Sequence, residues 1–203
     1  MSYIVATGFD QNAWDKYGLN WVRHAKSESL EAIIVGDGLS SPALDKINEL
    51  GFQYLNVKSG FNIKCNFYYT LLQKLQQGQR CLWTIPAILP RAQIETSVDL
   101  VCGISDFGAE YLTSSVVNLY DRAAMIQSLN ESIRQKHGGF LSSEYILGTY
   151  DFWNGFVGCQ TYLHERQYID ANQTSDDLIL NFFVAFANSI SCKIEKYPAK
   201  EAA

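Results

Sequence analysis

The 203-residue chain is 47% hydrophobic and 18% charged, with a formal net charge of −5 at pH 7. This composition excludes a disordered chain, and the acidic balance without any long Lys/Arg cluster argues against a nucleic-acid binder. The apolar runs are shorter than the roughly 20 residues needed to cross a bilayer, so no membrane span is expected.

The first half of the chain alternates between short apolar runs and amphipathic stretches. The apolar runs predict strands at residues 3–9, 31–38, 52–60, 80–85 and 98–105. Apolar residues at helical spacing, with capping residues such as Asn12 and Ser40, predict helices between the early strands, at 12–26, 40–51 and 62–77. Together these elements predict an α/β fold with a mostly parallel open sheet that is flanked by helices on both faces.

The second half is less regular. Its pattern predicts a helix at 114–136, a loop at 136–143, a strand at 156–163, a helix at 174–190 and a final strand or tail at 191–198. No repeat, low-complexity run or linker interrupts the chain. One domain over residues 1–203 is therefore the prediction.

The cysteines and the N-terminus indicate the compartment. Five cysteines are scattered without a C-x-x-C spacing, and residues 1–9 resemble a strand more than a signal peptide. We therefore expect a cytoplasmic protein with reduced thiols. The three histidines lie far apart in the sequence and predict no metal site.

Ligands of an open parallel sheet bind beyond the carboxyl ends of its strands, so residues at those ends are the candidates for a site. Thr7 and Gly8 end the first predicted strand, and Asp37 follows the second between two glycines. A carboxylate there can accept hydrogen bonds from ribose or a base, although Gly-Asp-Gly is also an ordinary turn. Neither G-x-G-x-x-G after the first strand nor a P-loop is present, which argues against classical dinucleotide or P-loop binding.

Lys64 and Asn66 fall in the first turns of the helix predicted at 62–77. The amides of a helix N-terminus, together with a lysine, suit an anionic group. The alternative is a solvated lysine beside an asparagine cap.

Three stretches in this order resemble the GT-A glycosyltransferase family: IIVGDGLSSP (33–42), SGFNIKCN (59–66) and CLWTIPAILP (81–90). That family has an Asp after strand two, a Gly-plus-Asn helix start after strand three, and a D-x-D motif at the end of strand four. The resemblance implies a nucleotide-sugar donor and a hydroxyl acceptor as partners. It also implies nucleotide contacts from five residues: Thr7, Gly8, Asp37, Lys64 and Asn66.

The sequence departs from the family at the D-x-D position, where Ile85, Pro86 and Ala87 stand. The family's two carboxylates hold a divalent ion that bridges the diphosphate, and Ile and Ala have no oxygen donors for it. No metal cofactor is therefore expected. A metal-free enzyme needs fixed cations near the diphosphate, and Arg91 is the better candidate besides Lys64, since Arg80 is expected on the far side.

Two late segments resemble the acceptor side of such enzymes. In TSDD (174–177), Asp176 or Asp177 would face the acceptor as a general base, although a capping box alone explains both acids without catalysis. In YDFWNG (150–155), Trp153 and Asn154 would contact the acceptor, although the aromatic residues also suit a core.

The sequence therefore supports more than one function. The first is a metal-independent transferase that uses a nucleotide-sugar donor. The second is a catalytically inactive GT-A-like domain that binds a ligand or a partner, and the third is an unrelated α/β protein. The donor sugar, the acceptor and the oligomeric state stay open.

Overall fold

The computed structural model describes residues 3–57, 63–91, 94, 97–104, 131, 139–166, 176–187 and 190–194. In helix α4 (Ile63–Leu72) it describes the backbone throughout and the side chains from Phe67 onward. Among these residues no helix has the length and the apolar content to cross a membrane.

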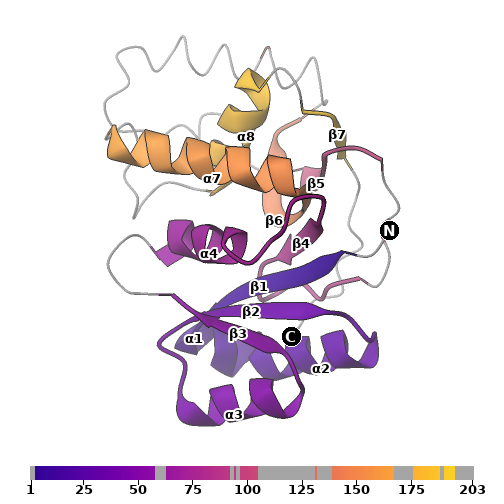
Figure 1. The fold of residues 1–203 in the computed structure, drawn as a ribbon, viewed down its shortest axis with the longest axis vertical. Coiled ribbons are helices and arrows are strands. Elements are labelled where there is room, and N and C mark those ends of the chain that lie inside the picture. The colour runs from indigo at the N-terminus through magenta and orange to yellow at the C-terminus, as the bar shows by residue number, and fades with distance from the viewer. Residues whose placement is uncertain are drawn as a thin grey trace.

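The described strands form one seven-stranded sheet in the order β3-β2-β1-β4-β6-β5-β7 (Figure 1). The strands are β1 (Ile4–Asp10), β2 (Ala32–Asp37), β3 (Gln53–Asn56), β4 (Arg80–Thr84), β5 (Leu100–Ile104), β6 (Leu141–Thr149) and β7 (Cys192–Ile194). Strand β6 is antiparallel to both β4 and β5, and the other neighbouring pairs are parallel. The strand order reverses between β1 and β4, because β2 and β3 lie on one side of β1 and β4 on the other.

Helices cover both faces of this sheet (Figure 1). One face carries α1 (Gln11–Ala13), the π-helical turn η1 (Trp14–Gly18), α2 (Leu19–Ser27) and α3 (Ser41–Glu49). The other face carries α4, α7 (Tyr150–Glu165) and α8 (Asp176–Phe186). This arrangement confirms the predicted α/β fold with a mostly parallel sheet.

Each face has its own apolar cluster, and β1 contributes to both. Ile4 and Ala6 belong to the cluster beneath α4, α7 and α8, whereas Val5 and Phe9 belong to the cluster beneath α2 and α3. Successive side chains of a strand point to opposite faces, so a strand that is covered on both sides has a continuous apolar run. The same alternation decides which face a polar residue of β1 can reach.

Most of the predicted elements are present. The helix predicted at 12–26 is the continuous run α1, η1 and α2, and the helix predicted at 62–77 is α4, which ends at Leu72. The predictions at 174–190 and 191–198 correspond to α8 and β7. The helix predicted at 114–136 lies outside the described residues, apart from Glu131.

Two predictions in the second half are wrong. Residues 156–163, predicted as a strand, belong to α7, whose buried side chains recur every three or four residues, as in a helix. The loop predicted at 136–143 runs into β6, whose first residues include the polar stretch Ser142, Ser143 and Glu144. That polar stretch hid the strand pattern, although Ile146 and Leu147 further along are fully buried.

Candidate active site

A cavity of about 350 Å³ opens at the carboxyl ends of β1 and β4, between α4 and the start of α8. We call it the strand-end pocket. Because the strand order reverses between β1 and β4, the cavity lies where open α/β sheets bind their ligands. Its walls have an apolar side, which includes Ile85 and Pro86, and an acidic side.

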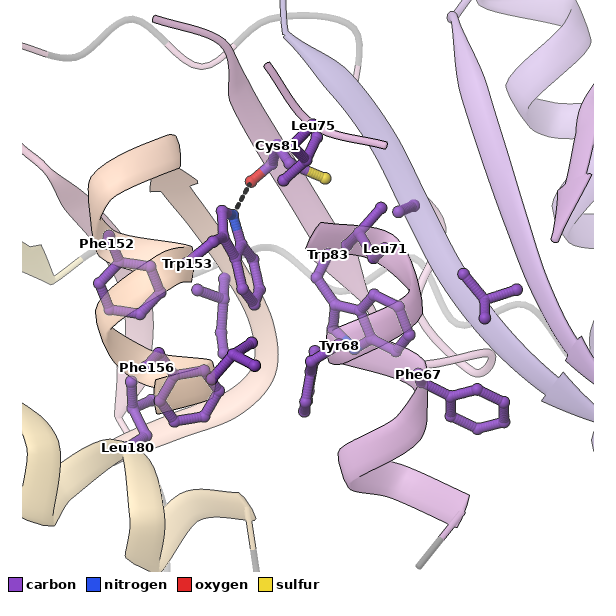
Figure 2. Packing of buried hydrophobic residues seen from close by; sticks show 14 of the residues in the cluster. Phe67, Tyr68, Leu71, Leu75, Cys81, Trp83, Phe152, Trp153, Phe156 and Leu180 are labelled. Carbon is purple, nitrogen blue, oxygen red and sulfur yellow. Dashed lines mark hydrogen bonds between the residues drawn. The ribbon is translucent and has the colours of Figure 1, made fainter. Parts of the chain in front are cut away.

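Three aromatic side chains form the apolar floor of the pocket: Phe67 and Tyr68 from α4, and Trp83 from β4. The ring centroids of Tyr68 and Trp83 are 4.8 Å apart, and those of Phe67 and Trp83 are 6.3 Å apart (Figure 2). Gly8 lies against these rings. A Cβ atom at that position would come within 2.7 Å of Phe67 and 2.9 Å of Trp83, so a larger residue would force the rings to shift.

The acidic side begins with Asp177, which joins α8 to β6. Its side chain is 9% exposed, and its Oδ1 accepts hydrogen bonds from the Ser143 backbone N–H at 2.6 Å and from the Ser143 hydroxyl at 2.5 Å. One turn later, the fully buried Asn181 pairs with both the N–H and the carbonyl of Leu141, each at 2.8 Å. These contacts fix the first turns of α8 against the start of β6.

Asp176 is more exposed than Asp177 and is reached from two other helices. The Tyr68 hydroxyl donates to Asp176 Oδ2 at 3.3 Å, and Gln160 Nε2 of α7 donates to Oδ1 at 3.4 Å. Gln160 itself is 1% exposed, and its Oε1 has no hydrogen-bond partner within the described part of the chain. Two neutral donors from α4 and α7 thus contact the carboxylate of Asp176 at the pocket wall.

The expected nucleotide-binding residues lie near this pocket with one exception. Asp37 pairs in register with Asp10, which lines the pocket, and so lies one strand away from it. Burial raises the pKa of Tyr54, and the nearby Asp37 carboxylate adds to this effect. Lys64 and Asn66 lie in the first turn of α4, directly before the floor residues, and their side chains are outside the described set.

The exception is Thr7. Its side chain is fully buried, and by the alternation along β1 it points to the α2 face together with Val5 and Phe9. The expectation that Thr7 contacts a nucleotide from the pocket is therefore corrected. Adjacent residues of a strand face opposite ways, so Gly8 lines the pocket and Thr7 does not.

Arg91 is also placed away from the pocket. After β4 the chain folds back along the α2 face, where Trp21 Nε1 donates to the Ile88 carbonyl at 3.1 Å. It reaches Tyr3, just before β1, whose hydroxyl donates to the Arg91 carbonyl at 2.6 Å. Burial raises the pKa of Tyr3 to about 12, and the Arg91 charge opposes that rise. Arg91 thus lies near the amino end of β1, at the other end of the strands from the pocket. This corrects its expected role beside a diphosphate.

The expected acceptor residues Trp153 and Asn154 likewise lie elsewhere. Trp153 is 1% exposed, donates from Nε1 to the Cys81 carbonyl at 3.2 Å and stacks on Tyr68 (Figure 2). Asn154 is exposed in the first turns of α7, which starts beside the beginning of β4 because β6 is antiparallel. Trp153 is therefore a core residue, and Asn154 does not line the pocket.

The pocket thus combines Gly8, Asp176 and Asp177 from the sequence-based set with Tyr68 and Ser143, which the sequence did not single out. Gln160, which was not singled out either, contacts Asp176 without lining the pocket. Ser143 could not be found from the sequence, since β6 was not predicted. Tyr68 and Gln160 gave no signal beyond their helical spacing.

No model of a known protein family matches the sequence, and no curated protein matches it. Solved structures do match. The galactosyltransferase LgtC in complex with donor and acceptor sugar analogs superposes with a TM-score of 0.55 at 14% identity, over 89% of this chain and 70% of that chain. Glucosyl-3-phosphoglycerate synthase from Mycobacterium tuberculosis in complex with UDP gives 0.52 at 11% identity, over 85% and 69%. This chain has the GT-A fold.

The end of β4 is where a GT-A enzyme with a D-x-D motif would place its metal. Here Ile85 and Pro86 line the pocket with apolar atoms, and Ala87 follows. Among the described residues, no group of three or more His, Cys, Asp or Glu side chains could hold a metal ion. The residues at this strand end therefore do not fit the divalent ion, although the synthase named above was also solved with Mn²⁺, UDP and glucosyl-3-phosphoglycerate.

Proposed function

We propose that this chain is a glycosyltransferase, which moves a sugar from a nucleotide-sugar donor to a hydroxyl acceptor without a metal at the end of β4. The observation that carries the proposal is the Asp176 carboxylate, held at the wall of a pocket at the switch point of a GT-A fold. In this assignment Asp176 is the general base. Asp177 is the structural carboxylate that holds α8 on β6.

The base accepts the proton of the acceptor hydroxyl. A carboxylate within hydrogen-bond reach of that hydroxyl raises the nucleophilicity of its oxygen as the bond forms. Tyr68 and Gln160 both donate to Asp176, so they fix the orientation of the carboxylate. Of these two positioning residues, Tyr68 is held in the aromatic core. Its ring packs on Trp83, Trp153 and Phe156 (Figure 2).

The bond changes follow from this arrangement. The acceptor oxygen forms a bond to the anomeric carbon of the donor sugar, and the bond from that carbon to the diphosphate oxygen breaks. The bonding electron pair leaves with the diphosphate, while the proton passes to Asp176. The amides at the start of α4, with Lys64, are proposed to stabilise the leaving diphosphate.

The apolar floor has a part in this proposal as well. The rings of Phe67, Tyr68 and Trp83 offer a surface for the C–H face of a sugar and keep water from the anomeric carbon. Exclusion of water favours transfer over hydrolysis of the donor.

Thermal unfolding with a panel of nucleotide sugars, in EDTA and in manganese, tests the proposal. We expect one donor to raise the unfolding temperature in EDTA, with a stabilisation of about 2.7 kcal/mol at a hundredfold excess over its Kd. Asp37→Ala should weaken this binding. Asp176→Asn should retain donor binding but lose at least a hundredfold in transfer rate, while Asp45→Asn, on the exposed side of α3, should behave as wild type.

Failure of every donor to bind would overturn the proposal. Binding that requires manganese would overturn its metal-independent part.

The apolar end of β4 favours one other candidate, a catalytically inactive GT-A-like domain that binds a sugar ligand. Ile85 and Ala87 remove the metal ligands on which GT-A enzymes with a D-x-D motif depend. In that case a donor or a sugar binds without turnover, so wild type shows no transfer for Asp176→Asn to lose.

A further inference from the structure

Two cysteine side chains lie together on neighbouring strands at the edge of the sheet. Cys102 belongs to β5 and Cys192 to β7, and both are free thiols. In the register of these parallel strands Cys192 pairs with Leu100, two residues before Cys102, so the two cysteines are diagonal neighbours. Cys102 belongs to the apolar cluster beneath α4, α7 and α8, and Cys192 packs against that cluster, so both side chains lie on the same face of the sheet.

The two thiols differ in their exposure and in their acidity. Cys102 is fully buried, whereas Cys192 is partly exposed. The Cys102 thiol donates a hydrogen bond to the Cys192 sulfur, and this bond raises the pKa of Cys102 well above its ordinary value and lowers the pKa of Cys192. Burial acts in the same direction on the pKa of Cys102 and opposes the change at Cys192. Because the thiolate is the nucleophile in thiol oxidation, Cys192 is the more reactive of the two.

We infer that Cys102 and Cys192 form a peroxide-sensitive dithiol, in which Cys192 is oxidised first and Cys102 then closes a disulfide between β5 and β7. The contact between the two side chains carries the inference, since a second thiol beside an accessible one is the arrangement that converts a sulfenic acid into a disulfide. Neither cysteine lines the strand-end pocket, so the inference does not depend on the proposed transferase.

Two steps account for the atoms and the electrons. In the first, the Cys192 thiolate attacks one oxygen of hydrogen peroxide, the O–O bond breaks, and hydroxide leaves and takes up a proton to become water. Cys192 is now a sulfenic acid. In the second, the Cys102 sulfur attacks the sulfenic sulfur, an S–S bond forms, the S–O bond breaks, and hydroxide leaves with the Cys102 proton as water. The two thiols lose two electrons in total, and one peroxide is reduced to two waters.

The disulfide requires a movement of β7. Strands about 4.8 Å apart, with a rise of about 3.3 Å per residue, put the Cα atoms of such diagonal neighbours about 8 Å apart. A relaxed disulfide needs roughly 4.4–6.8 Å between them. Since Cys192 lies opposite Leu100, β7 has to slide along β5 toward Cys102. Because β7 is a three-residue strand at the edge of the sheet, few backbone hydrogen bonds oppose the slide, but the hydrogen bonds from Ser191 to Asp99 do.

Peptide mass spectrometry of the full chain after oxidation tests the inference. The reduced protein is exposed to hydrogen peroxide at pH 7 for increasing times, and the remaining thiols are blocked with N-ethylmaleimide. We expect the disulfide between Cys102 and Cys192 to accumulate at least about tenfold faster than any oxidation of Cys159. That thiol is also partly exposed, but burial raises its pKa to about 11. Equal rates at Cys159 and Cys192, or oxidation without this disulfide, would overturn the inference.

Variants separate the roles of the two cysteines. Cys192→Ser should form no disulfide at Cys102. Cys102→Ala should stop at the sulfenic acid of Cys192, which dimedone traps. A disulfide from Cys192 to another cysteine in this variant would contradict the assignment of Cys102 as its partner. Cys159→Ser is the control and should oxidise as wild type does.

A last variant tests the movement of β7. Ser191→Ala removes the hydroxyl that donates to Asp99 at 2.7 Å, so it should speed the conversion of the sulfenic acid to the disulfide at least about twofold. Ser27→Ala removes a hydroxyl hydrogen bond within α2, at 2.8 Å to the His24 carbonyl, and should leave the rate unchanged. An unchanged rate in Ser191→Ala would mean that the disulfide closes without the slide, which contradicts the proposed movement.

Discussion

Gly8 shows how one residue shapes the pocket. It lies in the buried part of β1 beneath two rings, and a Cβ atom there would lie 2.7 Å from Phe67 and 2.9 Å from Trp83. We predict that Gly8→Ala lowers the free energy of unfolding by about 1–3 kcal/mol, because the rings have to shift. It should also weaken any ligand that binds over the floor. Urea denaturation measures the change in stability, and titration of each protein with a nucleotide sugar measures the change in ligand affinity.

Gly158 of α7 provides the matched control, since no described atom outside the backbone of its own helix lies within 4 Å of its added Cβ. Gly158→Ala should raise stability by up to about 1 kcal/mol through helix propensity. If both substitutions have the same effect, the close packing over Gly8 is not the cause.

At the scale of residues, the sequence predicted which residues form the site better than it predicted which way their side chains point. Gly8, Asp176 and Asp177 were singled out and do line the pocket. Thr7 was paired with Gly8 because both end a strand, yet adjacent strand residues face opposite sides, so only one of them could reach the cavity. The alternation of side chains along a strand applies to any predicted strand, so it could have excluded either Thr7 or Gly8 from the pocket.

At the scale of elements, a polar contact between Ser191 and Asp99 supports the position of β7 beside β5. It is a three-residue strand at the edge of the sheet, and Ser191 before it donates to Asp99 from its backbone N–H at 3.0 Å and from its hydroxyl at 2.7 Å. These hydrogen bonds lower the pKa of Asp99 below its ordinary value of 3.8. The charged form of Asp99 therefore adds to the backbone pairing of β7 with β5.

The lowered pKa of Asp99 makes its contribution to stability depend on pH. A carboxyl group with a lowered folded-state pKa contributes stability above its unfolded pKa, and this contribution disappears as the pH falls through the folded pKa. We predict that Asp99→Asn is less stable than wild type above about pH 5 and that the difference shrinks below about pH 4. Urea denaturation between pH 3 and 7 measures it, with Asp45→Asn as the control. A difference that does not vary with pH would contradict the prediction.

Elements were predicted well where the chain alternates strand and helix, and also for α8 and β7, but poorly for β6 and α7 between them. The early strands are buried on both faces, so their apolar runs are unmistakable. Strand β6 was not predicted because polar residues lie near its start, among them Ser143, which donates hydrogen bonds to Asp177 of α8. Once β6 was missed, the direction of the following helix was unknown, and the positions of Trp153 and Asn154 could not be derived.

At the scale of the whole molecule, the pocket is a product of topology. Parallel strands whose order reverses between β1 and β4 leave a crevice there, and the antiparallel β6 brings Ser143 and the start of α8 to the same edge. The parallel strands and helices of the first part could be predicted from their alternation, but their order in the sheet could not. The second could not, because it depends on contacts between segments far apart in the sequence.

The same topology predicts the effect of restoring the missing carboxylates. Ile85 and Ala87 are partly exposed at the end of β4, and Ile85 lines the pocket, so we expect aspartates there to be tolerated and, under the proposed function, to face the diphosphate. We predict that the double variant Ile85→Asp, Ala87→Asp binds UDP at least tenfold more tightly in manganese than in EDTA, about 1.4 kcal/mol. Wild type should show no such difference, and neither should the variant with asparagine at both positions, since amides lack the charge that Mn²⁺ requires. Isothermal titration calorimetry gives all three comparisons, and a double-aspartate variant without manganese dependence would mean that this strand end does not face the diphosphate.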